Sequence, residues 1–308
     1  MIEIRGLHRY FGSLKAVKDV SFRFDRGQVF GFIGPNGAGK TTTMRILATI
    51  DVPTRGDAFV DGLSVVNDPD KVRRLIGFMP DNFATYPNVN CWEYVDFYAR
   101  AYCLRGKARK IAVDRVMRFT ELDTLAQKPI DGLSKGMKQR LCLARSMIHD
   151  PKVLILDEPA AGLDPRARIE LRELIKLLAS EGKAILISSH ILTELAEMCD
   201  VVGIIELGQL VAAGPVNSIQ STKRAVALLD IRVLRDVDRV QNWLSEQHDV
   251  GEVTSNNREV TIHYSTDEAA QHELLDRMMA AKLPVVAFRS REENLEDVFM
   301  AVTKGKVQ

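Results

Sequence analysis

A glycine-rich segment near the amino terminus constrains the fold of this 308-residue chain more than any other feature. It follows the short apolar run 29–33 and precedes apolar residues at helical spacing from Thr41 to Ile50. The segment reads Gly34-Pro35-Asn36-Gly37-Ala38-Gly39-Lys40-Thr41. This is the pattern GxxxxGK[ST] between a strand and a helix, which predicts a loop that wraps a phosphate group.

The residue types in this loop are suited to binding phosphate. Glycines let the backbone curl so that successive N–H groups face an anion, and the following helix adds the positive end of its dipole. Lys40 supplies a charge for the β- and γ-phosphates, and the Thr41 hydroxyl can bind Mg²⁺. We expect the phosphates of a nucleotide to be bound by the whole segment and by the next residue: Gly34, Pro35, Asn36, Gly37, Ala38, Gly39, Lys40, Thr41 and Thr42.

A second apolar run, 153–156, ends at Asp157 and Glu158. A continuous apolar run of this length predicts a strand buried on both faces of a parallel sheet. Acidic residues at its carboxyl end lie at the edge where such sheets bind ligands. We predict that Asp157 binds Mg²⁺, directly or through water, and that Glu158 activates the attacking water. Together with the loop, this run indicates a P-loop NTPase.

The order of patterns predicts an α/β domain with a helical insertion. An amphipathic helix is predicted from Pro165 to Glu181, before a third apolar run at 184–187, and this rhythm is typical of a parallel sheet covered by helices. From 85 to about 150 there are helical patterns without a strand between them. These patterns cover 91–103, 107–121 and 135–149.

The remaining residues predict a second, smaller domain. We expect residues 1–216 to form the first domain, the polar stretch 217–224 to be a linker, and 225–308 to be accessory. The accessory part has the order βαββαβ, with a hairpin turn at 255–257 and a closing helix at 294–303, which fits a ferredoxin-like α+β domain.

Composition excludes several classes of protein. The 42 basic and 41 acidic side chains leave a net charge of +1, so the overall charge of the chain gives no reason to expect that it binds nucleic acid. The four cysteines form no metal-binding pair and are typical of a reduced, cytosolic protein. We expect no signal peptide and no membrane-spanning segment.

A third motif specifies the kind of NTPase. It begins the last helix of the insertion and reads Leu133-Ser134-Lys135-Gly136-Met137-Lys138-Gln139-Arg140. Ser134 and Gly136 at a helix amino terminus form a second possible anion site. The alternative is an ordinary helix cap, with the polar residues that follow on a solvated face.

Taken together, the motifs resemble the nucleotide-binding subunit of ATP-binding cassette (ABC) transporters, over residues 1 to about 216. Residues 133–140 resemble the family signature, 162–164 its D-loop, and 189–190 the segment with its switch histidine. This implies an α/β P-loop NTPase fold with a helical signature subdomain at about 85–150 and an antiparallel β amino-terminal part.

The resemblance also implies an adenine contact. Phe11 stands where the family stacks an aromatic ring on adenine, and Tyr10 is the alternative. Either ring could instead be a core aromatic of an edge strand, and His190 could equally be structural.

The family mechanism implies partners. Two cassettes dimerise head to tail, and each ATP lies between one phosphate loop and the partner's signature helix. Ser134 and Gly136 would then close on the γ-phosphate bound at Lys40 of the other chain. His190 would hold the γ-phosphate, and Asp164 would link the two sites.

The sequence departs from the family pattern in two places. Lys135 and Met137 replace the usual glycine and glutamine, a variant that resembles exporter-type cassettes with a separate, compact permease. After the predicted strand 76–80, Asp81 replaces the glutamine that senses Mg²⁺ and water. We hypothesise that Asp81 keeps this role and steepens the dependence on Mg²⁺. The alternative is a loop carboxylate that never reaches the metal.

The leading interpretation is therefore an ATPase subunit of an ABC exporter. It would be cytoplasmic and held at the membrane by a separate permease. It would pair with a second nucleotide-binding subunit, and a homodimer is favoured over a heterodimer. One alternative is an ABC-class ATPase of ribosomes or DNA, but the sequence lacks the second cassette, zinc-binding cysteines or long coiled coil of those classes. The other is an ATP-binding module whose hydrolysis Asp81 has weakened.

Overall fold

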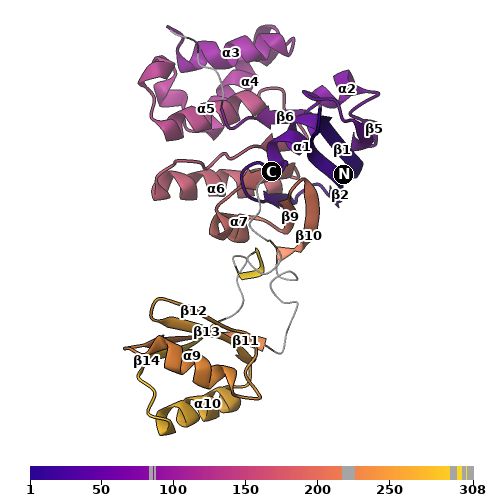
Figure 1. Cartoon of the computed structure of the whole chain (residues 1–308). Helices are drawn as coiled ribbons and strands as arrows, with labels where there is room; N and C mark the ends of the chain where they lie inside the picture. Colours follow the sequence, from indigo (N-terminus) through magenta and orange to yellow (C-terminus); the bar gives the residue numbers. More distant parts are fainter. Residues whose placement is uncertain (83–85, 87, 217–225, 292–296, 300–302, 304–308) are drawn as a thin grey trace. The chain divides into compact units, whose positions relative to one another are not determined.

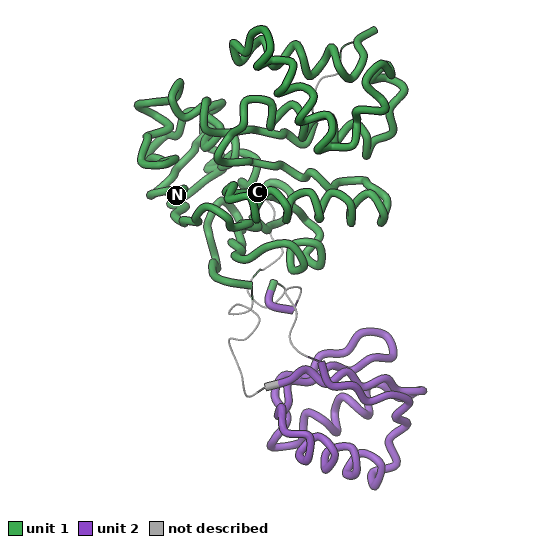
Figure 2. Tube along the Cα trace, turned by 180° about the vertical axis from the view of Figure 1, so that it is seen from behind, with its two compact units in different colours: residues 1–216, 299–308 green, residues 217–298 purple. Residues whose placement is uncertain are grey.

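The computed structural model describes all residues except 83–85, 87, 217–225, 292–296, 300–302 and 304–308 (Figure 1). The chain forms two compact units (Figure 2). One contains Met1–Val216 together with the end of the chain from Phe299, and the other contains Asn217–Val298. Each unit is described by itself below.

The first unit is built on a six-stranded, mainly parallel sheet of order β10-β9-β3-β8-β7-β6. All residues of its central strands are buried, as the apolar runs predict. Its strands are β3 (Val29–Ile33), β6 (Ile76–Met79), β7 (Val153–Leu156), β8 (Ala184–Ser189), β9 (Val201–Glu206) and the antiparallel edge β10 (Gln209–Pro215). Its helices are α1 (Lys40–Leu47), α6 (Pro165–Ser180) and α7 (Leu192–Met198). The predicted parallel sheet is confirmed.

A second, antiparallel sheet of order β2-β1-β4-β5 forms the amino-terminal part of this unit. Phe22 and Phe24 on β2 pack on Phe30 and Phe32 of β3, and the rings of Phe22 and Phe30 stack with centroids 4.5 Å apart. This aromatic contact joins both sheets into one core. The elements are β1 (Ile2–Phe11), β2 (Leu14–Phe24), β4 (Arg55–Val60), β5 (Leu63–Ser64) and the short helix α2 (Pro69–Arg73).

The helical insertion consists of α3 (Cys91–Ala101), α4 (Gly106–Phe119) and α5 (Lys135–Met147), with single 3-10 turns at Asp123–Leu125 and Ile130–Gly132. The start of α3 is fixed by a capping box, in which Asn90 and Glu93 each accept the other's backbone N–H. All three predicted helices are present.

The second unit is an antiparallel sheet of order β12-β13-β11-β14 with two helices. It comprises β11 (Val226–Val233), α9 (Val237–Ser245), β12 (Val253–Asn256), β13 (Glu259–Ser265), α10 (Glu268–Ala280) and β14 (Val285–Arg291). This is the predicted order βαββαβ. The predicted closing helix 294–303 lies largely outside the described residues.

The prediction places the hairpin turn of this unit two residues too early. Ser255 and Asn256 are paired in β12, opposite Val260 and Glu259. The turn instead begins at Asn257, whose φ of 53° is a left-handed conformation that asparagine tolerates.

Within the described part of the chain, no helix is both long and apolar enough to cross a membrane.

Candidate functional site

Four neighbouring parallel strands bring the predicted site residues to one edge of the main sheet. The loop 34–39 follows β3, and His190 follows β8. Asp157 and Glu158 follow β7, and Asp81 lies just after β6. Because parallel strands end at the same edge, segments far apart in the sequence meet there.

The backbone of the glycine-rich loop lies too close to its surroundings for side chains at two positions. A Cβ atom on Gly34 would lie 2.3 Å from the carbonyl oxygen of Ile205. Gly39, with φ of 105°, would place a Cβ atom 2.4 Å from the carbonyl oxygen of Ala16. These glycines therefore allow the tight curl from which the loop amides can face an anion.

The Lys40 side chain is buried inside the curl. Its ammonium donates to the carbonyl of Gly34 at 2.6 Å and of Pro35 at 3.3 Å, and it lies 3.8 Å from Glu158 Oε1. Burial lowers the pKa of Lys40, which the negative charges of Glu158 and Asp157 oppose. The loop thus holds a cation beside the carboxylates that end β7.

Asp157 and Glu158 are joined through one hydroxyl. Ser188 Oγ donates to Asp157 Oδ1 at 2.6 Å and accepts the Glu158 backbone N–H at 2.9 Å. Burial raises the pKa of Asp157, hydrogen bonds from Ser188 and Thr41 lower it, and the charges of Glu158 and Asp81 add to the rise. Glu158 has φ of 50°, a strained conformation for this residue.

Glu158 contacts two further ionisable groups through its two carboxylate oxygens. Oε2 lies 2.8 Å from Nδ1 of His190, whereas Oε1 faces Lys40. The Glu158 side chain is largely buried, but the His190 ring is 56% exposed. The carboxylate is therefore fixed by a cation on one side and an imidazole on the other, while the imidazole remains accessible from outside.

A cavity of about 360 Å³ contains the loop and the acidic residues. Its lining comprises Phe11, Leu14, Ala16, Pro35, Asn36, Gly37, Ala38, Gly39, Lys40, Thr41, Thr42, Asp81 and Glu158. Asp81 thus faces the same space as Glu158. Its charge also acts on Asp157.

Of the two candidate aromatic rings, Phe11 lines this cavity and is 46% exposed. The Arg9 guanidinium lies over the Phe11 ring, 4.4 Å from its centroid. The Tyr10 hydroxyl is instead hydrogen bonded to His8 Nδ1 at 2.9 Å. The exposed ring at the cavity is therefore Phe11.

The signature residues lie at a different cavity, of about 300 Å³. Ser134, Gly136 and Asp164 line it, and no loop residue from 34 to 42 is part of this lining. Ser134 caps α5 by accepting the Met137 N–H at 3.3 Å, and Asp164 caps α6 in the same way. Ser134 thus caps its helix, but Gln139, which the cap alternative placed on a solvated face, is only 4% exposed. One chain keeps Ser134, Gly136 and Asp164 apart from its own phosphate loop.

Sequence reasoning missed Ser188. The sequence does show a hydroxyl residue at the carboxyl end of 184–189. This residue is significant only because that strand pairs with β7, which carries the two acids. That pairing is set by the sheet order, which the sequence pattern does not supply.

Comparisons with known proteins agree with this geometry. Residues 17–161 match the family described as ABC transporter, and residues 214–303 match the family described as ATP-binding protein DrrA1-3-like, C-terminal domain. YxlF of Bacillus subtilis strain 168, an uncharacterised ABC transporter ATP-binding protein, is 32% identical over 302 residues, which cover 98% of this chain and 99% of YxlF. The chain belongs to the family of ABC transporter ATP-binding proteins.

Two further matches cover a smaller share of the chain. YbhF of Escherichia coli K12, named a probable multidrug ABC transporter ATP-binding protein, is 36% identical over 221 residues. The match covers 72% of this ABC protein but only 38% of YbhF. A solved structure titled as an ATP-binding subunit of an ABC transporter superposes with a TM-score of 0.65 at 29% identity, over 72% of this chain and 92% of that one. Family and P-loop NTPase fold are thus as predicted.

Proposed function

We propose that this chain is the ATP-hydrolysing subunit of an ABC transporter. The observation that carries the proposal is the position of Glu158, 2.8 Å from His190 and 3.8 Å from Lys40, beside the glycine-rich loop. The loop amides and the helix dipole would bind the triphosphate, and the Lys40 ammonium would exchange its carbonyl partners for phosphate oxygens.

The proposed reaction is transfer of the γ-phosphoryl group to water. The water oxygen forms a bond to the γ-phosphorus, the bond to the bridging oxygen of ADP breaks, and Glu158 accepts the proton from water. His190 would orient the Glu158 carboxylate and donate a hydrogen bond to the γ-phosphate. Its exposure leaves it free to reach a nucleotide in the cavity.

The donor set fits Mg²⁺. Thr41, Asp157 and Asp81 supply hydroxyl and carboxylate oxygens, and Mg²⁺ is commonly held by one or two carboxylates with phosphate oxygens and water. No group of three or more His, Cys, Asp or Glu side chains in the described residues forms a metal centre by itself. When bound, Mg²⁺ would neutralise charge on the phosphates. Asp81 would replace the family's glutamine at this position.

The rest of the nucleotide would lie along the same cavity. We propose that the Phe11 ring stacks on adenine, because it is exposed there and its neighbour Tyr10 is bonded to His8.

The separation of the two cavities supports a dimer. Ser134, Gly136 and Asp164 lie at a cavity outside the phosphate loop of their own chain. In a head-to-tail dimer they would face the nucleotide bound at the partner's Lys40. Because one chain carries both halves of the composite site, we propose a homodimer.

The domain organisation supports a transport role. We propose that residues 1–216 are the nucleotide-binding domain with its helical subdomain at about 85–150, that 217–224 are a linker, and that 225–308 are an accessory domain. The Lys135 and Met137 variant and the match to a DrrA-like C-terminal domain favour an exporter with a separate permease, on whose cytoplasmic side this chain would lie. We expect no nucleic-acid partner.

The test is the Glu158→Gln variant of the full chain, with Glu173→Gln, an exposed residue of α6, as control. We expect Glu158→Gln to bind ATP, to lose at least about 100-fold in kcat, and to elute as an ATP-dependent dimer of this chain alone. The control should keep the kcat of the unaltered protein. Turnover of Glu158→Gln at the unaltered rate would refute the role of Glu158, and a monomer with ATP bound would refute the homodimer.

A further inference from the structure

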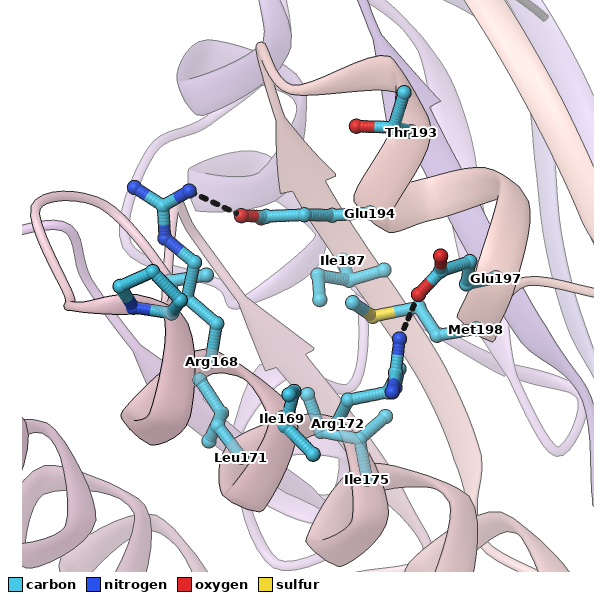
Figure 3. Close-up of a pocket in the computed structure, with 12 residues that line it drawn as sticks. Arg168, Ile169, Leu171, Arg172, Ile175, Ile187, Thr193, Glu194, Glu197 and Met198 are labelled. Atoms are coloured by element: carbon cyan, nitrogen blue, oxygen red, sulfur yellow. Dashed lines mark ion pairs between the residues drawn. The ribbon is translucent and has the colours of Figure 1, made fainter. Parts of the chain in front are cut away.

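A groove of about 350 Å³ lies between α6 and α7, on the two helices that leave the candidate site (Figure 3). Its floor is apolar, with Leu171, Ile175 and Ile187. Two arginines of α6 and two glutamates of α7 face each other across it. They form the ion pairs Arg168–Glu194 and Arg172–Glu197.

The position of the first pair in the chain relates it to the site. Arg168 lies one helical turn after Asp164, the residue that caps α6. Glu194 lies four residues after His190, the residue that contacts Glu158, and belongs to the first turn of α7. The pair therefore connects the segment that would meet a partner chain with the segment that presents the imidazole.

The first pair is more enclosed than an ordinary surface ion pair. Arg168 Nη1 lies 3.1 Å from Glu194 Oε1, and the Glu194 side chain is only 14% exposed. Both Glu194 oxygens and Arg168 Nε are buried without a well-directed hydrogen bond among the described residues. Loss of Arg168 would leave a poorly solvated carboxylate.

Electrostatic interactions extend from this pair to the site. Burial raises the pKa of Glu194, electrostatic interactions with Arg168, His190 and Arg172 lower it, and the charge of Glu158 raises it again. Glu194 thus interacts with both members of the Glu158–His190 contact as well as with Arg168.

The start of α7 needs such support. Its first residues have no side-chain cap, since Ile191 stands at the cap position. In the turn after His190, the Ile191 N–H donates to Ser189 Oγ at 3.0 Å, and the Ile191 carbonyl accepts only a long bond of 3.4 Å from the Leu195 N–H. The direction of α7, and with it the place of the imidazole, therefore depends on contacts further along the helix.

Resting on the ATPase function proposed above, we propose that Arg168 and Glu194 are positioning residues that couple the segment at Asp164 to the orientation of His190 against Glu158. When a partner chain contacts Asp164, the resulting shift of α6 would then act through this ion pair on the orientation of the His190 imidazole. Neither residue touches the nucleotide in this account, so nucleotide affinity should not depend on them.

The test uses Arg168→Gln, Glu194→Gln and the double variant of the full chain, in steady-state ATPase assays. Each single variant should lose about tenfold in kcat while the KM for ATP changes less than about twofold, and the double variant should be no slower than the slower single one. Arg168→Lys keeps the charge and should recover kcat to within about threefold of the unaltered protein.

The matched control is Glu197→Gln in the neighbouring pair. This pair joins the same two helices one turn further from the site, and Glu197 is 59% exposed. Glu197→Gln should keep kcat within about twofold. The inference is overturned if Glu194→Gln and Glu197→Gln have equal kcat, if only KM changes, or if the single effects add in the double variant. Absence of turnover in the unaltered chain with ATP bound would instead refute the ATPase proposal itself.

Discussion

Replacement of Ser188 by alanine removes the single hydroxyl that joins the two acidic residues of the site. Ser188 Oγ donates to Asp157 Oδ1 at 2.6 Å and accepts the Glu158 N–H at 2.9 Å. Ser188 is fully buried, so water cannot take its place without rearrangement. The variant leaves a buried acceptor on Asp157 and a partly buried donor on Glu158 without this partner, and it frees the strained backbone of Glu158.

The magnitude follows from these two bonds. A buried group left without its partner costs about 1–3 kcal/mol, and Asp157 retains a hydrogen bond from Thr41. We therefore expect the free energy of unfolding to fall by about 2–3 kcal/mol. In a domain of this size, 1 kcal/mol shifts the unfolding midpoint by about 2–4 °C, so Tm should fall by roughly 5–10 °C. Because Glu158 can relax from its φ of 50°, kcat should fall about tenfold as well.

Ser146→Ala is the matched control. Ser146 is also buried, but its hydroxyl donates to the carbonyl of Leu143 within its own helix α5, away from the site. Its loss should cost about 1 kcal/mol or less and leave kcat unchanged. The measurements are thermal unfolding by circular dichroism and steady-state ATPase rates, both on the full chain. Equal losses of Tm and of kcat in the two variants would refute the role given to the Ser188 hydroxyl.

Two further predictions concern the loop and the metal. Gly34→Ala should abolish ATP binding, because its Cβ would lie 2.3 Å from the Ile205 carbonyl oxygen. Gly37→Ala should weaken binding only about threefold to tenfold, because Gly37 has a φ of 78° but no atom within 4 Å of such a Cβ. Equal affinities of the two variants in a nucleotide titration would contradict this. Asp81→Gln should give a shallower dependence of the ATPase rate on Mg²⁺ concentration than the unaltered protein, and superimposable curves would show that Asp81 does not act on the metal.

The secondary structure of the main sheet could be predicted because its strands are buried on both faces. The run 153–156 is apolar at every position, and the structure buries all four residues. Local signals are weaker where a strand has an exposed face. In β12, Ser255 and Asn256 resemble turn residues, yet cross-strand pairing with β13 extends the strand through them. Tertiary pairing, which a local pattern does not contain, decided the position of that turn.

The site shows the same division between local and spatial information. The loop 34–41 and the acids Asp157 and Glu158 could be predicted because each depends on a contiguous segment with one chemical use. Ser188 could not, because its role depends on which strand lies next to β7. The choice between Phe11 and Tyr10 likewise needed the structure, because two adjacent rings are separated by the position of Phe11 in the cavity lining and by the contact of Tyr10 with His8.

Lys135, which replaces the glycine usual in the family signature, lies close to Gly162 of the same chain. A Cβ atom on Gly162 would lie 2.3 Å from the Lys135 ammonium nitrogen, and Gly162 has φ of 67°, so the lysine occupies the space that a side chain at 162 would need. Lys135 directly follows the cap of α5, and Gly162 lies two residues before the cap of α6. Under the proposed function, these two helix starts would both face the nucleotide of a partner chain. Because the Lys135 side chain lies against Gly162, a partner that contacts one helix start would also contact the other, and through α6 it could act on the ion pair of Arg168 with Glu194.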